Sequence, residues 1–267
     1  GEDALREIMT GHGGFEHNAQ GLRVVDILED KYPNFPGLNL TWEVREGIVK
    51  HSTFFDLPAT VIGFEQGILP LLETQIVDVA DEIAYDNHDL DDGITSGIIK
   101  EPSLKNIGIW KKACGAIKKK YPGLSGKKEK YQIVRTLINA QVTDLIRESE
   151  KNIKKFGIKS PQEAKKFSAK IITFSNGMLK ERKPMRRFLM KNLYKHYRVV
   201  RMSDKANRFI KKLFEIYFAK PQQLPPVSQK RLKKEGTYRV ICDYIAGMTD
   251  RYALDEYKKF FEPYERV

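Results

Sequence analysis

The sequence predicts an all-α protein with a basic, helical C-terminal lobe. Three observations favour this fold class: apolar residues recur at helical spacing, prolines and glycines end successive helical stretches, and no stretch alternates apolar and polar residues between hairpin turns. Of the 267 residues, 41% are hydrophobic and 31% are charged, so the chain can bury a core. These values exclude a disordered chain, a fibre and a small disulfide-rich scaffold.

The first helices are predicted from apolar spacing and from the residues that stop it. One helix starts near Leu22 and ends in residues 32–37, which contain two prolines and a glycine. Thr41 is the expected N-cap of a second helix that runs through Ile48. A long helix is expected over about residues 69–98.

The C-terminal part is predicted to hold further helices. A lysine-rich loop near residues 121–123 separates them from the long helix. Pro184 is expected to start a helix that runs through Tyr197, because proline is tolerated in the first turn. Ser203 is expected to start another helix through Phe218, and three prolines then form a stiff connector before the last helical stretch.

Charge divides the chain into two parts, residues 1–100 and a basic helical lobe over residues 101–267, within what we expect to be one all-α domain. Residues 1–100 carry 6 basic and 19 acidic side chains, whereas residues 101–267 carry 41 basic and 16 acidic ones. A basic field of this size attracts phosphates or nucleic acid, and the acidic part could hold a cation. A solvated basic surface without a ligand explains the charge equally well.

Two cysteines, Cys114 and Cys242, fit a reducing, cytoplasmic compartment and are too few for a zinc site made of thiolates. Glu65 and Glu73 interrupt the most apolar stretch, so no membrane span is expected. The chain begins with Gly1 and a charged segment, without a secretion signal, and we expect the native start to be missing.

The most informative stretch for function is residues 76–92. Residues four apart on a helix lie about 6 Å apart along its axis, so Asp81, Tyr85 and Asp89 would form one stripe roughly the length of a nucleotide. Carboxylates there could ligate a divalent cation or accept from a sugar hydroxyl, and the phenol could donate to phosphate. A solvated acidic face is the alternative. The apolar face expected to bury this helix comprises Ile76, Val79, Ala80, Ile83, Leu90 and Ile94.

Two further clusters could take part in chemistry. One gathers His12, Glu16 and His17 with nearby amides, which suits proton transfer or phosphate binding. The other places Arg186 two helical steps of four before Tyr194, and arginine offers a planar fork for phosphate; a basic helix flank with core aromatic residues is the alternative. Because no Walker loop or dinucleotide fingerprint is present, side chains would have to hold phosphate, which favours a metal-assisted helical hydrolase.

Four segments together resemble the HD-superfamily deoxynucleoside triphosphate triphosphohydrolases, the dGTPase-like proteins. They occur in family order over nearly the whole chain, and together they are specific, although each alone is weak. They are residues 14–23 (GFEHNAQGLR), residues 40–43 (LTWE) with 47–51 (GIVKH), residues 79–85 (VADEIAY) with 88–90 (HDL), and residues 243–253 (DYIAGMTDRYA).

This resemblance implies an all-helical, HD-domain-like phosphohydrolase that cleaves a dNTP into deoxynucleoside and intact triphosphate. It also implies a divalent metal, Mg²⁺, Mn²⁺ or a similar ion, held by a His, a His-Asp pair and a later Asp, which is Asp81 here. Arg187 is the alternative to Arg186 if the helix register slips. By resemblance, the substrate contacts are Lys50, His51, Tyr85, Asp89, Arg186 and Tyr194, and the catalytic-pocket residues are Glu2, His17 and Asn18.

One departure from the family pattern concerns the first residues. Glu2 corresponds to the end of the family's Gly-His-x-Gly-Glu segment, and the His and His-Asp metal ligands that precede it are absent from this chain. The chain therefore resembles the C-terminal part of a longer enzyme. We expect these 267 residues alone neither to bind the catalytic metal tightly nor to turn over substrate.

Two other functions stay open at the level of sequence. One is a nucleic-acid-binding protein that uses the basic lobe, although no aromatic stacking platform is evident among its lysines. The other is a catalytically silent homologue that binds dNTPs. The resemblance also implies a homo-oligomer, and nucleic acid or an allosteric nucleotide are further partners left open.

Overall fold

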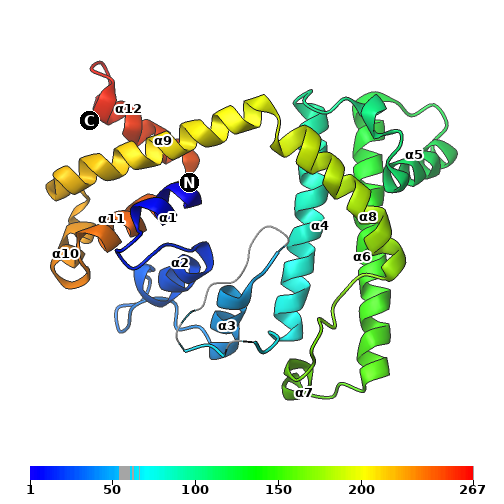
Figure 1. The fold of residues 1–267 in the computed structure, drawn as a ribbon, viewed down its shortest axis with the longest axis horizontal. Helices are drawn as coiled ribbons and strands as arrows, with labels where there is room; N and C mark the ends of the chain where they lie inside the picture. Colours follow the sequence, from blue (N-terminus) through cyan, green and yellow to red (C-terminus); the bar gives the residue numbers. More distant parts are fainter. Residues whose placement is uncertain (54–60, 62, 66, 267) are drawn as a thin grey trace. The chain divides into compact units, whose positions relative to one another are not determined.

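The computed structural model describes residues 1–53, 61, 63–65 and 67–266, and it confirms the all-α fold class, with no strand in this part of the chain (Figure 1). None of its helices is both long and apolar enough to cross a bilayer. The first α-helices are α1 (Glu2–Ile8), α2 (His17–Arg23), α3 (Trp42–Lys50), α4 (Leu72–Thr95), α5 (Gly108–Lys120) and α6 (Gly126–Phe156). The later ones are α7 (Pro161–Lys165), α8 (Asn176–Leu189), α9 (Tyr197–Ala219), α10 (Pro226–Glu235), α11 (Thr237–Ala246) and α12 (Asp250–Phe261). The shorter turns are η1 (Val24–Leu28) and η3 (Met190–Tyr194), which are π-helical, and η2 (Glu101–Leu104) and η4 (Pro221–Gln223), which are 3-10.

The chain folds into two compact units. Unit 1 comprises residues 1–40 and 200–267, and unit 2 comprises residues 41–199. Unit 1 therefore contains both ends of the chain, whereas unit 2 is one continuous segment. These units are defined by packing within the chain, whereas the division at residue 100 is predicted from charge. That division therefore stays a prediction.

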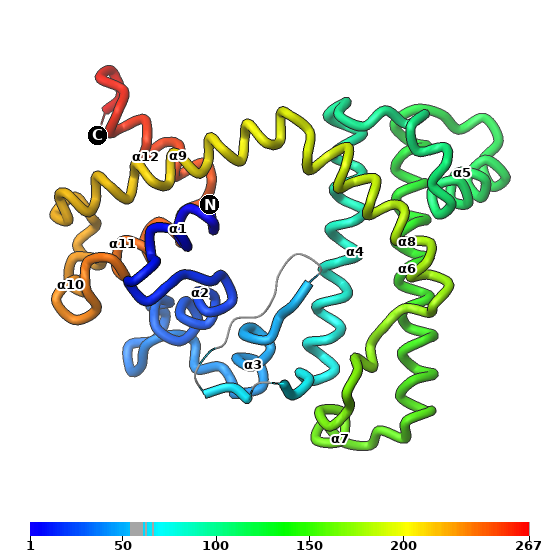
Figure 2. The backbone as a smooth tube through the Cα atoms, viewed as in Figure 1, coloured from blue at the N-terminus to red at the C-terminus, as the bar shows by residue number. Residues whose placement is uncertain are grey.

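In unit 1, α9 packs on α1 and α11. The core includes Leu5 and Met9 at α1, Tyr217 of α9 and Ile241 of α11, all of them buried. The Tyr217 hydroxyl donates to Glu256 of α12 at 2.6 Å, which ties the last helix to the same core. Figure 2 shows the trace of α9 along these helices.

In unit 2, α4 packs against α6 and α8, and α5 covers α6 and α8 (Figure 1). Leu90 of α4, Trp110 of α5, Leu137 of α6 and Leu189 of α8 lie in one buried cluster. A smaller cluster includes Ile83, which lies two turns earlier on α4. The packing on two other helices fixes the rotation of α4 about its axis, and so decides which α4 side chains stay accessible.

Several helix boundaries agree with the sequence prediction. Thr41 is the N-cap of α3, with extended backbone angles (φ −64°, ψ 160°), although its side chain makes no capping hydrogen bond. The long helix α4 lies inside the expected range 69–98. A loop is present near residues 121–123 as expected, but it separates α5 from α6 rather than the long helix from the later ones, because α5 already precedes it.

The predicted start of the helix at Pro184 is wrong. The helix α8 already begins at Asn176, where Ser175 caps it by accepting a hydrogen bond from the Met178 N–H at 3.2 Å, and Pro184 lies inside it. An interior proline costs about 3 kcal/mol relative to alanine, and burial of Met185 and Leu189 beyond it offsets that cost.

The next two boundaries also differ from the prediction. The helical stretch from Pro184 does not continue through Tyr197, because a π-helical turn and a short break intervene, and α9 starts at Tyr197 rather than at Ser203. The helix α2 likewise starts at His17, ahead of the expected Leu22. Capping and tertiary packing, rather than apolar spacing, set these boundaries.

The apolar face predicted for α4 is correct in its middle but wrong at its start. Ile76 and Ala80 are exposed, and polar residues are buried in their place. Gln75 is one of these: its side-chain oxygen accepts from the N–H groups of Ile171 and Ile172 at 2.9 and 3.2 Å. The start of α4 is therefore held by hydrogen bonds to a neighbouring segment rather than by apolar packing.

Candidate functional site

The three side chains of the predicted stripe on α4 differ in their exposure to solvent. The Asp81 side chain is 46% exposed, and Tyr85 is 50% exposed. Asp89, two turns further on, is partly buried. The stripe is thus neither fully solvated nor buried, and each of its carboxylates has a specific neighbour.

His51 is the neighbour of Asp81, and a buried carboxylate orients it. The Nδ1 atom of His51 lies 2.8 Å from Oδ1 of Asp78, and its Nε2 atom lies 3.8 Å from Oδ2 of Asp81. Asp78 also accepts from Lys170 Nζ at 2.6 Å and from the Ser52 N–H at 3.1 Å. Since the carboxylate of Asp78 accepts from Nδ1–H, the imidazole presents Nε2 to Asp81.

Lys50, the other expected phosphate contact beside His51, is engaged elsewhere. Its ammonium group lies 2.8 Å from Oε1 of Glu46 and donates to the Ile68 carbonyl at 3.1 Å. Lys165 binds the second oxygen of the same carboxylate at 2.6 Å. The role of Lys50 at phosphate stays a prediction, and it would require the ammonium group to exchange Glu46 for the ligand.

Asp89 and Tyr194 form a hydrogen-bonded pair between α4 and the π-helical turn η3. The Tyr194 hydroxyl donates to Oδ2 of Asp89. Burial raises the pKa of Asp89 above its usual value, and the hydrogen bond from Tyr194 opposes this effect. Burial and the Asp89 carboxylate together raise the pKa of Tyr194. The wider turn of a π-helix places Tyr194, and such turns are frequent at functional sites.

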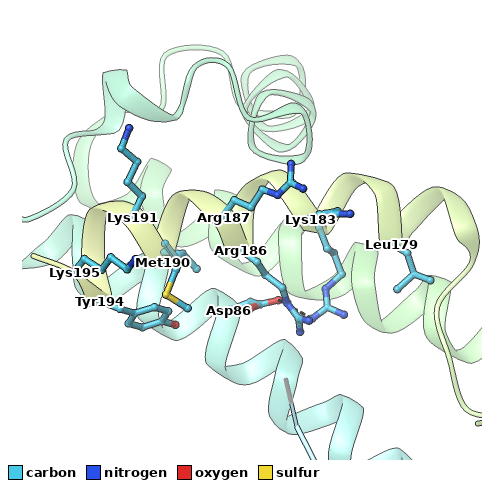
Figure 3. Close-up of a pocket in the computed structure, with 11 residues that line it drawn as sticks. Asp86, Leu179, Lys183, Arg186, Arg187, Met190, Lys191, Tyr194 and Lys195 are labelled. Carbon is cyan, nitrogen blue, oxygen red and sulfur yellow. Dashed lines mark hydrogen bonds and ion pairs between the residues drawn. The ribbon is translucent and has the colours of Figure 1, made fainter. Parts of the chain in front are cut away.

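Arg186 belongs to a four-residue ion network that joins α8 to α4. Its guanidinium donates to Asp86 at 2.8 Å and to Glu82 at 2.5 Å. Arg182, one turn earlier and almost fully buried, donates to the same Asp86 oxygen at 2.6 Å. Figure 3 shows the Arg187 side chain directed away from Asp86. The helix register therefore aims Arg186, and not its neighbour, at α4.

A cavity of about 420 Å³ lies along this flank of α8 (Figure 3). Its volume is within the range of small-molecule sites, about 300–1,000 Å³. Its lining includes one carboxylate, Asp86, and the apolar side chains of Leu179, Leu189 and Met190 beside Tyr194. Asp86 is already bound by two arginines, so the balance of charge suits an anionic ligand. The cations that line the cavity are Arg182, Lys183, Arg186, Arg187, Lys191 and Lys195.

In unit 1, Glu2 and His17 come together with Glu16. The Nδ1 atom of His17 lies 3.1 Å from carboxylate oxygens of both glutamates. Glu16 is the N-cap of α2 and accepts from the N–H groups of Asn18 and Ala19 at 3.0 and 2.8 Å. Two carboxylates beside one imidazole fix Nδ1–H toward them, which suits a proton-transfer group.

The two other residues of the predicted cluster lie differently. Asn18 is buried in α2 directly behind the Glu16 cap. His12 is stacked on Tyr238 of α11, with ring centroids 3.5 Å apart. The sequence cluster therefore separates into a carboxylate–imidazole group and a histidine in an aromatic contact.

An ion network anchors the helix that carries His17. Asp243 of α11 is buried and accepts from Gln20 at 3.1 Å and from Arg23 at 2.8 Å, both on α2. Arg231 of α10 donates to the same carboxylate and to Glu235. The hydrogen bond from Arg231, together with Arg23, lowers the pKa of Glu235 to about 2, against the opposing effect of burial.

The groups of unit 2 fit one part of a divalent metal site. Carboxylate oxygen and imidazole nitrogen are ligands that such ions accept. Among the carboxylates at 78, 81, 82 and 86, all within the described part of α4, only that of Asp81 is not paired with a lysine or arginine. Asp81 is thus the carboxylate of this group best able to take a cation, with His51 Nε2 beside it.

A second group of acidic and histidine ligands, Glu2, Glu16 and His17, has its ligand atoms within 4.8 Å of one another. Glu16 already caps α2, and Glu2 accepts from Arg6 at 2.7 Å. A cation would have to displace these donors, so the cluster fits a proton-transfer role better than a metal.

Comparison of the amino-acid sequence with known proteins identifies the family of this chain. The chain is 47% identical over 268 residues to the deoxyguanosinetriphosphate triphosphohydrolase-like protein of Geobacter sulfurreducens, covering 100% of this chain and 70% of that protein. A protein of the same name from Thiobacillus denitrificans is 42% identical over 266 residues, covering 98% of this chain and 70% of the relative. The chain belongs to the deoxyguanosinetriphosphate triphosphohydrolase-like family. Residues 172–259 also match the phosphohydrolase-associated domain.

Family membership agrees with the resemblance carried by the four sequence segments, and the fold is that of an all-α, HD-like phosphohydrolase. The phosphohydrolase-associated domain spans both α8, with Arg186, and α11, with Asp243. Two charged residues that sequence reasoning missed, Asp78 and Arg182, bind His51 and Asp86. The one sequence pattern that indicates Arg182 is its spacing of four residues from Arg186, which places both arginines on the same face of the helix.

Proposed function

We propose that this protein hydrolyses deoxynucleoside triphosphates to deoxynucleoside and inorganic triphosphate with a divalent metal ion. The observation that carries the proposal is the cationic cavity on α8, which adjoins the Asp89–Tyr194 pair in a chain of the triphosphohydrolase-like family. Cations suit the phosphates, apolar side chains suit the base, and a carboxylate suits a sugar hydroxyl.

The residues of unit 2 would bind and orient the substrate. Arg186 would bind phosphate oxygens by exchanging part of its contact with Glu82, and Arg182 would keep Asp86 occupied so that this carboxylate does not repel the ligand. Tyr194 and Asp89 would position the sugar, and Tyr85 would donate to phosphate. Lys50 and His51 are proposed contacts of the phosphate chain.

Asp81 would be a metal ligand, supported by its accessible carboxylate and by His51 beside it. When bound, Mg²⁺ or Mn²⁺ supplies Lewis acidity toward phosphate and water. Glu2 and His17 would hold and move the proton, because Nδ1 of His17 is fixed by carboxylates and the second ring nitrogen can then exchange a proton. Asn18, buried behind the Glu16 cap, would be a third residue of this group.

We also propose a cytoplasmic location and a homo-oligomer. The location is supported by two cysteines without a disulfide, of which Cys242 is buried. The oligomer rests on the family resemblance alone, and light scattering of the purified protein tests it.

Product analysis tests the proposed reaction. The gene product at its full length is incubated with each dNTP and Mn²⁺ or Mg²⁺, and the phosphate products are separated by ion-exchange chromatography. The proposal requires intact triphosphate in equal amount to deoxynucleoside. Release of pyrophosphate or orthophosphate instead would contradict it, and dNTP binding without any product would favour the catalytically silent alternative.

A further inference from the structure

The turn between α5 and α6 carries an excess of positive charge that the proposed hydrolase site does not use. Residues 111–130 contain eight lysines and one glutamate. Five of these lysines lie at the tip of the helical hairpin, are exposed, and have no ion-pair partner among the described residues. They are Lys118, Lys119, Lys120, Lys127 and Lys128.

Helix stability does not account for all of this charge. Lys118, Lys119 and Lys120 occupy the last turn of α5, where positive charge interacts favourably with the helix dipole. Lys127 and Lys128 occupy the first turn of α6, where the same dipole disfavours positive charge. The two α6 lysines therefore carry a cost that a ligand of negative charge would offset.

Two exposed tyrosines lie among these lysines. Tyr121 is 41% exposed, and Lys120 Nζ lies 5.3 Å from its ring centroid. Tyr131 is 48% exposed, and Lys127 Nζ lies 5.8 Å from its ring centroid. The aromatic platform that the sequence does not reveal is thus present in the fold, because the hairpin brings both rings to the lysine-rich tip.

We infer that the α5–α6 tip, comprising Lys118–Tyr121, Lys127, Lys128 and Tyr131, binds single-stranded nucleic acid. Lysines contact the backbone phosphates, and the tyrosine rings stack on unpaired bases, which are accessible in a single strand but not in a duplex. An anionic membrane fits less well, because Tyr121 and Tyr131 are the exposed large hydrophobic residues of this tip, and insertion requires a wider apolar face.

Fluorescence anisotropy with a labelled 20-nucleotide oligo-dT tests this inference on the 267-residue chain. We expect binding that weakens with salt. Each neutralised phosphate of a single strand adds about 0.7 to the log–log salt slope, so Lys127→Gln/Lys128→Gln should reduce that slope by about 1.4. Because this change removes unfavourable charge from the start of α6, it should not unfold the protein. Tyr131→Ala should weaken binding by about 5- to 100-fold and leave the slope unchanged.

The matched control is Lys233→Gln/Lys234→Gln, which removes two exposed lysines from the last turn of α10. It lowers net charge equally and should leave the salt slope unchanged. Three results would overturn the inference: equal weakening of binding in this control, binding of a blunt duplex or of phosphatidylserine vesicles as tight as that of oligo-dT, or no oligo-dT binding at low salt. Thermal melting of each variant confirms that the fold is intact.

Discussion

Oδ1 of Asp78 lies 2.8 Å from Nδ1 of His51, and the Asp78 side chain is almost completely buried. A buried carboxylate in this position fixes both the ring orientation and the tautomer of the imidazole, as acidic partners of metal-site histidines do. The pair joins the end of α3 to the start of α4, and it directs the other imidazole nitrogen toward Asp81.

Asp78→Asn is therefore expected to reduce kcat by about 10- to 100-fold, because the amide no longer fixes His51. KM for dNTP should change less, since the cationic cavity on α8 is untouched. Steady-state kinetics of triphosphate release by the full-length gene product measures both. Asp92→Asn, at an exposed position on the same helix, is the control. An unchanged kcat in a folded Asp78→Asn protein would show that Asp78 and His51 do not belong to the catalytic site.

The adjacent arginines of α8 should differ in their effect on substrate binding. Arg186→Ala removes the guanidinium directed at α4, and removal of a charged hydrogen bond to phosphate costs about 1.5–3 kcal/mol, so dNTP affinity should fall by at least tenfold. Arg187→Ala should have a smaller effect, because Arg187 lines the same cavity but its side chain is directed away from Asp86. Isothermal titration with dGTP compares the two. A larger effect of Arg187→Ala would mean that Arg187, and not Arg186, contacts the bound substrate.

Tyr194→Phe should shift the pH dependence of dNTP binding. The Tyr194 hydroxyl donates to Asp89 and opposes the effect of burial, which raises the pKa of that carboxyl. Without the hydroxyl the pKa of Asp89 rises further, so ionised Asp89 should form only at higher pH. Dissociation constants measured across the acidic pH range should show a higher midpoint in the variant. If the midpoint pH is unchanged or lower in the variant, nucleotide binding does not depend on ionised Asp89.

Acid stability should depend on Glu235. Its folded-state pKa is lowered to about 2 from the usual 4.5, chiefly by the hydrogen bond from Arg231. A lowered carboxyl pKa gives stability that is fully present above pH 4.5 and is lost as pH falls from there toward 2. Glu235→Gln should therefore lower the unfolding free energy at neutral pH by about 1–3 kcal/mol and flatten its decline in acid. Urea unfolding across this range measures both, and an unaltered pH profile would contradict the assignment.

Local patterns predicted the helices, but the partners of the site residues required the fold. The spacing of Asp81, Tyr85 and Asp89 identified the relevant helix because all three lie on one element. The neighbours of that stripe come from distant positions: Arg182 meets Asp86 across 96 residues, and Tyr194 meets Asp89 across 105. No local period encodes such contacts.

Proline and buried polar residues explain the errors along the chain. Pro184 indicates a helix start by local rules, yet packing on both sides carries α8 through it. Gln75 occupies a buried position where the apolar pattern favoured Ile76, because its amide binds the backbone of a segment 96 residues away. In both places, tertiary contacts outweigh local propensity.

The most direct test of the proposed function is the effect of Asp81→Ala on triphosphate release by the full-length gene product at saturating Mn²⁺. Asp92→Ala, which removes an exposed carboxylate about three turns further along α4, serves as the reference. Removal of the accessible carboxylate beside His51 should abolish turnover together with metal binding, whereas the reference variant should retain both. Wild-type turnover in Asp81→Ala would contradict the metal assignment and the site built around it.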